Sequence, residues 1–375
     1  MHIVLAPDSF KESLSAMEVA KALQQGLAKA LPHATFDAMP IGDGGEGTLA
    51  ALADGLGLTY DSHDVTGPFG QTIKATYAQN EEMAVFEMAD ICGLEMVEPA
   101  RRNPLKITTR GVGEMIIHLL EQGISDIMVG VGGSSSIDGG LGMAKALGYC
   151  FLDASGREVE PVGDSLSEIY QIDSSHVSPL LEGLSLTIIT DVSHVLCGKQ
   201  GATYTFGHQK GLPFKQFEQV DRAMERLYKL IDPTILSRKG SGAGGGMAAG
   251  LVTFAKGQIV SGIDAVLDMV NCDERMTKAD LVIVGEGRLD RQSLAGKAPV
   301  GVARRVPKGT PVVAICGSIS EEVSCLDYQK EGICAAFSII ERLESLENTL
   351  KEAKPNLIRT AENIGHLLSL SYPRD

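Results

Sequence analysis

Short apolar runs alternate with amphipathic stretches along most of this chain. The apolar runs have the length and composition of buried strands, and we predict strands at His2–Leu5, Phe36–Pro40, Ile73–Tyr77, Met83–Glu87, Asp126–Val131, Leu184–Thr190, Leu281–Val284, Val312–Cys316 and Cys334–Ile340. Apolar residues at helical spacing predict helices at Ala16–Ala30, Thr48–Ala53, Gly113–Glu121, Leu141–Leu147, Phe217–Leu230, Ile263–Val270, Ala298–Arg305 and Leu357–Leu370. Strands that alternate with helices predict an α/β fold with a largely parallel sheet.

The alternation is interrupted in the middle of the chain by turn-rich segments, at about 65–78 and 151–173, and it becomes regular again after about residue 260. We therefore predict two domains, which the length of 375 residues also favours. Residues 1–65 and 260–375 would form a discontinuous Rossmann-like or flavodoxin-like parallel-sheet domain. Residues 66–259 would form an inserted mixed α/β domain, with the active site in the cleft between the two.

The composition limits the partners of this protein. A formal charge of −15 repels nucleic acid and anionic membranes, so an anionic substrate needs a locally basic pocket. The seven cysteines are scattered, with no paired spacing, which indicates reduced thiols and no zinc site. The sequence shows no basic and apolar leader and no apolar run of membrane-spanning length. We expect a cytoplasmic protein, either a monomer or a homodimer.

Polar residues that could bind a ligand or take part in catalysis follow the first predicted strand. Asp8, Ser9 and Lys11 lie between that strand and a helix whose start is marked by a capping box, Ser15 with Glu18. The carboxyl end of a strand is where open α/β sheets bind ligands. The alternative is that Asp8 and Ser9 only cap turns, as such residues often do.

The same arrangement returns after the later strands. Carboxylates, hydroxyls and glycines dominate the segments Asp43–Gly47, Gly132–Gly140, Asp191, Glu286–Asp290 and Gly317–Ser318. Because the opposite strand ends carry no such groups, this asymmetry indicates an active site at the carboxyl edge. Tight turns also use glycine and capping residues regardless of function, so each loop has a structural alternative.

Two glycine-rich segments could hold phosphate through backbone N–H groups. The first consists of Gly132, Gly133, Ser134 and Ser135, just before a predicted helix, and the second contains Gly242, Gly244 and Gly245. The second also matches the spacing of a dinucleotide-binding loop. No predicted strand precedes it, however, and such a loop must follow a strand, so we do not favour this interpretation. A hinge or close helix packing is its structural alternative.

Several long motifs, in order along the chain, resemble those of the bacterial glycerate kinase family, type 1. They are APDSFK at Ala6–Lys11, IGDGGEGT at Ile41–Thr48, VGVGGSSSIDGG at Val129–Gly140 and VGEGRLDRQSLAGKAPVGVA at Val284–Ala303. The resemblance covers essentially the whole chain. It implies a two-domain α/β enzyme that phosphorylates D-glycerate with ATP, giving 2-phospho-D-glycerate.

Phosphoryl transfer requires phosphate cradles, a cation and a carboxylate that accepts the proton of the attacking hydroxyl. Asp191, at the end of a β-rich run, is our candidate for that carboxylate. Lys11 would face the transferred phosphate or the glycerate carboxylate, unless it is a solvated surface lysine. Asp43, Glu46 and Asp138 compete to hold Mg²⁺, with Asp43 and Asp138 as the candidate ligands.

The remaining candidates would bind substrate or assist catalysis. Asp8 and Arg288 join Asp191 and Lys11 as candidate catalytic residues, and Arg288 could clamp a carboxylate or a phosphate unless it forms only a surface salt bridge. The candidate substrate-binding residues are Ser9, Asp43, Glu46, Arg288 and Lys297. Three other functions stay open: a glycerate 3-kinase, a nicotinamide-dependent hydroxy-acid dehydrogenase, and a non-enzymatic binding protein for small organic acids.

Overall fold

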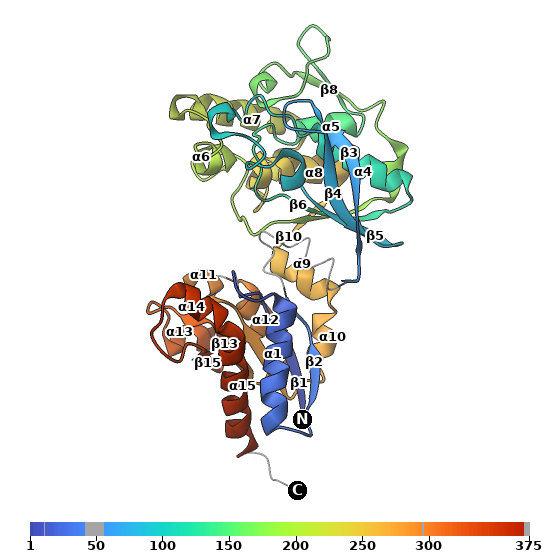
Figure 1. Cartoon of the computed structure of the whole chain (residues 1–375). Helices are drawn as coiled ribbons and strands as arrows, with labels where there is room; N and C mark the ends of the chain where they lie inside the picture. Colours follow the sequence, from blue (N-terminus) through green and yellow to red (C-terminus); the bar gives the residue numbers. More distant parts are fainter. Residues whose placement is uncertain (11, 42–55, 295, 371–375) are drawn as a thin grey trace. The chain divides into compact units, whose positions relative to one another are not determined.

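The computed structural model describes residues 1–10, 12–41, 56–294 and 296–370 (Figure 1). The chain divides into two compact units. Unit 1 comprises Met1–Gly47 and Ile263–Asp375, and unit 2 comprises Thr48–Gly262. Unit 1 is therefore built from both ends of the chain, and each unit has a sheet of its own. The predicted α/β class is confirmed.

Unit 1 contains a five-stranded parallel sheet with the strand order β15-β13-β11-β1-β2. Its strands are β1 (His2–Pro7), β2 (Thr35–Ala38), β11 (Leu281–Gly285), β13 (Val312–Cys316) and β15 (Ala335–Ser338). Within the unit this is the flavodoxin-like order 2-1-3-4-5. A two-stranded pair, β12 (Arg288–Leu289) and β14 (Ser318–Ile319), lies just beyond β11 and β13.

Helices α1 (Ala16–Ala30) and α15 (Ala353–Ser369) lie side by side and share a buried core with β1, β11 and β13 (Figure 1). The predicted capping box of Ser15 and Glu18 starts α1. Gly26 permits the close approach of the two helices, because a Cβ atom there would lie 2.2 Å from the carbonyl oxygen of Ile358. The other helices of unit 1 are α9 (Gly262–Met269), α10 (Cys272–Met276), α11 (Arg291–Leu294), α12 (Ala298–Arg305), α13 (Cys325–Lys330) and α14 (Leu346–Lys351).

Strands β1 and β11 meet where the strand order of unit 1 reverses direction. They are parallel and in register to their last residues, Pro7 and Gly285. Asp8 and Glu286 each come one residue later, and the backbone N–H of Asp8 donates to the carbonyl of Gly285 at 2.8 Å. This topological switch point, where doubly wound sheets bind ligands, is therefore flanked by two carboxylic side chains.

Unit 2 contains a six-stranded mixed sheet with the order β10-β9-β6-β5-β4-β3. Strands β5 (Met83–Glu87), β6 (Asp126–Gly130), β9 (Ser185–Ile189) and β10 (Gln258–Val260) are parallel, and β3 (Thr59–Thr66) and β4 (Thr72–Gln79) add an antiparallel hairpin. A small separate pair is formed by β7 (Cys150–Leu152) and β8 (Gln171–Asp173). The helices are α3 (Ala89–Cys92), α4 (Arg110–Glu121), α5 (Leu141–Ala146), α6 (Ala202–Phe206), α7 (Phe217–Ile231) and α8 (Met247–Ala255).

The observed domain boundaries differ from the predicted ones at one end. The predicted boundary after residue 65 falls inside β3, whose full length pairs with β4 in the sheet of unit 2. Strand β3 therefore belongs to unit 2, which begins earlier in the chain than we expected. The return to unit 1 at Ile263 is close to the predicted residue 260. The predicted helix at Thr48–Ala53 lies outside the described residues.

Candidate active site

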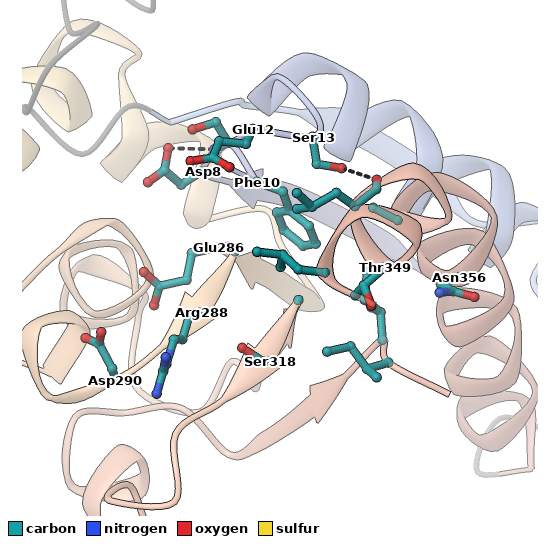
Figure 2. Close-up of a pocket in the computed structure, with 18 of the residues that line it drawn as sticks. Asp8, Phe10, Glu12, Ser13, Glu286, Arg288, Asp290, Ser318, Thr349 and Asn356 are labelled. Carbon is teal, nitrogen blue, oxygen red and sulfur yellow. Dashed lines mark hydrogen bonds between the residues drawn. The ribbon is translucent and has the colours of Figure 1, made fainter. Parts of the chain in front are cut away.

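A cavity of about 380 Å³ lies at the carboxyl edge of the parallel sheet of unit 1 (Figure 2). Residues that directly follow β1, β11, β13 and β15 line it, and α14 and the start of α15 contribute another wall. Four predicted site residues, Asp8, Ser9, Arg288 and Lys297, line this one cavity although they are far apart in the sequence. The switch-point geometry explains the convergence, because parallel strands bring their carboxyl ends to one edge.

One end of the cavity carries charge. Asp8, Glu286, Arg288 and Asp290 lie together on one side in Figure 2. Lys297 also lines the cavity and directly precedes α12. Asp8 is buried, and its carboxylate accepts the backbone N–H of Ser9 at 2.6 Å. With Glu12, which also lines the cavity, two cations and four carboxyl groups of the described residues form a polar site within an acidic protein.

Glu286 is a candidate functional residue that the sequence analysis placed in a strand-end segment but did not select. Its side chain is 7% exposed, and its Oε1 atom has no hydrogen-bond partner among the described residues. Burial raises the pKa of Glu286 to about 7, and the nearby negative charges of Asp8 and Asp290 also raise it, against the opposing effects of Ser293 and Lys297. A buried carboxyl group with a pKa near neutrality can exchange a proton at physiological pH.

The other end of the cavity is largely apolar. Phe10, Ile339, Leu350 and Ala353 line it, and the polar side chains of Thr349 and Asn356 lie beyond them (Figure 2). Phe10 and Ile339 are each 3% exposed and belong to the core of unit 1, so this wall is firmly packed. The cavity therefore changes from charged to apolar along its length.

In unit 2, the first glycine-rich segment follows β6. Gly132 and Gly133 are exposed, but Ser134 and Ser135 are buried and make hydrogen bonds within the protein. The hydroxyl of Ser135 donates to the carbonyl of Cys92 at 2.8 Å, and that of Ser134 accepts a hydrogen bond from Lys210 at 2.7 Å. Only the two glycines thus present open backbone in this segment.

The side chain of Lys210 makes hydrogen bonds to this segment and to the residue after it. Its ammonium group is buried and also donates to the carbonyl of Ser136 at 2.9 Å. Burial lowers the pKa of Lys210 to about 8, although Cys92 and Asp138 act to raise it. The sequence analysis did not select this lysine, because its partners are far away in the sequence and no local spacing marks it.

The second glycine-rich segment packs against the first one. A Cβ atom at Gly245 would lie 2.0 Å from the carbonyl oxygen of Ser136, and one at Gly242 would lie 2.3 Å from that of Val195. The backbone N–H of Gly139 donates to Gly245 at 3.2 Å. Gly244 has a positive φ of 66°, which favours glycine. Close packing, the structural alternative, therefore accounts for these glycines, and their phosphate-binding role stays a prediction.

Asp138 and Asp191 are also engaged with the protein. Asp138 is fully buried and accepts hydrogen bonds from the Thr109 hydroxyl at 2.6 Å and from the backbone N–H groups of Gly140 and Gly142 at 3.0 and 3.3 Å. Burial raises its pKa, and these hydrogen bonds oppose that effect. Asp191 is exposed in unit 2 and accepts the N–H of Gly262 at 3.0 Å. Their roles as metal ligand and base stay predictions.

Three predicted residues, Lys11, Asp43 and Glu46, lie outside the described residues. Within the described ranges, no group of three or more His, Cys, Asp or Glu side chains could hold a metal ion. Among the helices in those ranges, none combines the length and the apolar character needed to cross a membrane.

Comparison with known proteins shows which class of enzyme carries this site. The family model of the glycerate kinase family matches residues 3–369. A glycerate kinase of Neisseria meningitidis serogroup B is 50% identical over 370 residues, covering 99% of both chains. The glycerate 2-kinase of Escherichia coli K12 is 38% identical, covering 99% of this chain and 98% of that protein. The crystal structure of a protein assigned as glycerate kinase 2 from Salmonella typhimurium LT2 superposes with a TM-score of 0.86, at 39% identity and 99% coverage of both chains.

The fold and these relatives thus define a two-unit α/β phosphotransferase. The chain belongs to the glycerate kinase family. The resemblance found in its motifs is confirmed over almost the whole length.

Proposed function

We propose that this enzyme transfers the γ-phosphoryl group of ATP to the 2-hydroxyl of D-glycerate, giving 2-phospho-D-glycerate and ADP. The observation that carries the proposal is the buried Glu286, whose unpartnered Oε1 lies in the same cavity as two cationic side chains. The name of the Escherichia coli relative, glycerate 2-kinase, supports the choice of hydroxyl. The seven free cysteines support a reducing compartment, the cytoplasm.

Arg288 and Lys297 would hold the anionic groups of the substrates. Both side chains line the cavity, Arg288 at its charged end and Lys297 close enough to Glu286 to lower its pKa. The guanidinium of Arg288 can make two parallel hydrogen bonds to the carboxylate of glycerate, a geometry that an ammonium cannot offer. Lys297 supplies a compact positive charge suited to a phosphate. Together they offset the charge of two anionic substrates in an acidic protein.

Glu286 would serve as the general base. Its carboxylate takes the proton as the O–H bond of the glycerate 2-hydroxyl breaks, and the hydroxyl oxygen bonds to the γ-phosphorus of ATP. The bond from that phosphorus to the β–γ bridging oxygen then breaks, and ADP leaves with the electron pair. A base with a pKa near 7 suits this step at neutral pH. Asp191 stays the alternative base from the sequence prediction.

We propose that Mg²⁺ binds in this cavity together with the phosphates of ATP. Mg²⁺ prefers oxygen ligands, and in kinases it is bound by one or two carboxylates together with substrate phosphates. Asp8, buried at the switch point, is the carboxylate that would hold it. When bound, the ion would neutralise negative charge on the phosphates.

Phosphorus NMR of the product tests this proposal directly. The enzyme is incubated with ATP, Mg²⁺ and D-glycerate, and the product is compared with authentic 2-phosphoglycerate and 3-phosphoglycerate. We expect the 2-phosphate and stoichiometric ADP. A 3-phosphate would make the enzyme a glycerate 3-kinase, whereas oxidation of D-glycerate with NAD(P)⁺ and no ADP release would support a dehydrogenase.

A further inference from the structure

We infer that the apolar end of the unit 1 cavity binds the adenine ring of ATP, so that the base of the nucleotide and the acceptor substrate share one cavity. This inference rests on the proposed function and assigns the nucleotide to unit 1 instead of the glycine-rich segments of unit 2. It follows from the size of the cavity, its division into two ends and the polar groups at its far side.

The cavity is too large for the acceptor alone. Its volume of about 380 Å³ lies in the range, about 300–1,000 Å³, that holds ligands of drug size. Glycerate is a three-carbon acid, and its polar atoms match the charged end only. The remaining space therefore calls for a second, larger and mainly apolar group.

The wall of this remaining space suits a flat aromatic ring. Phe10, Ile339 and Ala353 are buried members of the unit 1 core, and the half-buried Leu350 on α14 completes the surface. Removal of the two faces of a purine from water against such side chains is favourable. Among the parts of the two substrates, only the adenine ring has such faces.

Two polar side chains mark where the edge of the ring would lie. The Thr349 hydroxyl donates to the carbonyl of Ser345 at 3.0 Å, which leaves its oxygen able to accept a hydrogen bond from a ligand. The amide of Asn356 is half-buried and makes no hydrogen bond to the described residues. An asparagine amide can donate to a ring nitrogen and accept from the amino group of adenine at the same time. Guanine presents a carbonyl in place of that amino group, so Asn356 would favour adenine.

This placement also orients the phosphates. In Figure 2, Thr349 and Asn356 lie on the side opposite to Asp8, Glu286 and Arg288, with Phe10 between the two groups. A nucleotide with its base at the apolar end extends its phosphates toward Arg288 and Lys297. The γ-phosphate then meets the glycerate hydroxyl near Glu286.

Calorimetric titration with Mg²⁺ and ADP, without glycerate, tests the inference apart from the reaction. Leu350→Glu places a carboxylate against the base, and Asn356→Ala removes the amide. We expect each change to raise the Kd for ADP about tenfold or more. Asn356→Ala should also reduce the ratio of the Kd for GDP to the Kd for ADP. Asn348→Ala, an exposed change on α14 outside the cavity lining, is the matched control and should bind as the parent does.

The outcomes separate this inference from the proposed function. If the parent binds ADP but both cavity variants bind it equally well, the inference is overturned while the kinase proposal stands. Weaker binding by Gly132→Val in that case would place the nucleotide at the segment after β6. If the parent binds no adenine nucleotide, both proposals fail. Circular dichroism of each variant shows whether it is folded.

Discussion

The two units each bury a carboxylic side chain in the loop after a central parallel strand, and the two side chains have opposite surroundings. Glu286 follows β11 in unit 1 and leaves Oε1 without a partner in a cavity. Asp138, in the loop after β6 of unit 2, is enclosed by Thr109 and two backbone N–H groups. Burial raises the pKa of both groups. The two carboxyl groups therefore differ in their free hydrogen-bonding capacity more than in their burial, which is why we propose a catalytic role for Glu286 and expect Asp138 to act on stability.

The cations of the two units show the same difference. Arg288 and Lys297 line the cavity of unit 1, where a ligand can reach them. Lys210 of unit 2 is buried and donates to Ser134 and Ser136. A buried lysine that bridges two loop residues fixes a backbone shape, whereas a cation at a cavity can exchange partners. The cations of unit 1 are therefore available to a ligand, whereas the lysine of unit 2 fixes the shape of a loop.

The largest expected effect comes from Glu286→Gln, which keeps the size of the side chain but removes the base. We predict that kcat falls about 10²–10⁴-fold. The thermal midpoint should stay close to that of the parent, because the lost charge has no partner at Oε1. Steady-state kinetics with D-glycerate at saturating ATP measure the effect.

Asp191→Asn is the paired variant in the same assay, because Asp191 is the base that the sequence predicted. We expect a small effect on kcat, since the amide oxygen can still accept the N–H of Gly262. A large fall in kcat for Asp191→Asn, with a normal rate for Glu286→Gln, would reverse the assignment.

Asp138→Ala should act on stability. The change leaves two buried N–H groups and the Thr109 hydroxyl without their acceptor, which costs about 2–4 kcal/mol of unfolding free energy. Urea unfolding measures the loss. Thr109→Val removes one of the same hydrogen bonds, so the double variant should lose less than the sum of the single changes. A stable Asp138→Ala enzyme that requires much more Mg²⁺ would instead support the metal-ligand prediction.

The lowered pKa of the buried Lys210 leads us to predict that the stability of the protein depends on pH. Its pKa is about 8 in the folded protein and 10.5 in the unfolded reference, so between these values only the unfolded chain holds the proton. The free energy of unfolding should therefore rise with pH across this window, by about 3 kcal/mol from this group. Lys210→Met should lack that contribution.

Urea midpoints of the parent and Lys210→Met at pH 7.5 and 9.5 give the comparison. The other groups that titrate in this range are common to both proteins, so their effects cancel in the difference. If the urea midpoints of the parent and of Lys210→Met change equally between the two pH values, Lys210 keeps its proton in the folded protein.

Arg288→Lys tests whether the exposed cation recognises a carboxylate. The ammonium keeps the charge but loses the two-pronged geometry, so we predict an increase of about tenfold in the KM for D-glycerate, with kcat little changed. Arg291→Lys is the matched control, because Arg291 is exposed and contacts Glu322 at 3.5 Å on the surface. Equal effects of the two changes would remove Arg288 from the substrate site.

Regular periodicity made much of the fold predictable. The predicted bounds of α1, α12, β5 and β13 match the structure to the residue. The sequence analysis missed β3, because its polar residues lie on an exposed edge strand, and α8, because it is apolar on all sides and follows a glycine-rich run. Patterns that report one buried face do not detect elements with no buried face or with two.

The site was predictable only where strand ends determine position. Asp8, Ser9, Arg288 and Lys297 share the cavity, as expected for residues at the carboxyl ends of parallel strands and the loops that follow them. Glu286 stands one residue after its strand, as Asp8 does, and this equivalence could have marked it. The sequence could not distinguish an open loop from a packed one, because the contact of Gly245 with Ser136 is set by tertiary packing.

The smallest expected effect concerns the proton on Glu286. The negative charge of Asp290 raises the pKa of Glu286, and its effect is weaker than that of Asp8. Asp290→Asn removes that charge while its amide oxygen can still accept the N–H groups of Gln292 and Ser293. The pKa of Glu286 should fall, so the base stays deprotonated at lower pH. The acid limb of kcat/KM, near pH 7 in the parent, should move down by roughly a few tenths of a pH unit.

Profiles of kcat/KM against pH for the parent, Asp290→Asn and Glu321→Gln decide this prediction. Glu321 is exposed and does not line the cavity, so Glu321→Gln removes the same charge without affecting Glu286. A downward shift in Asp290→Asn alone assigns the acid limb to the cavity. An acid limb that stays fixed in all three proteins belongs to another group, and the base would then have to be sought outside this cavity.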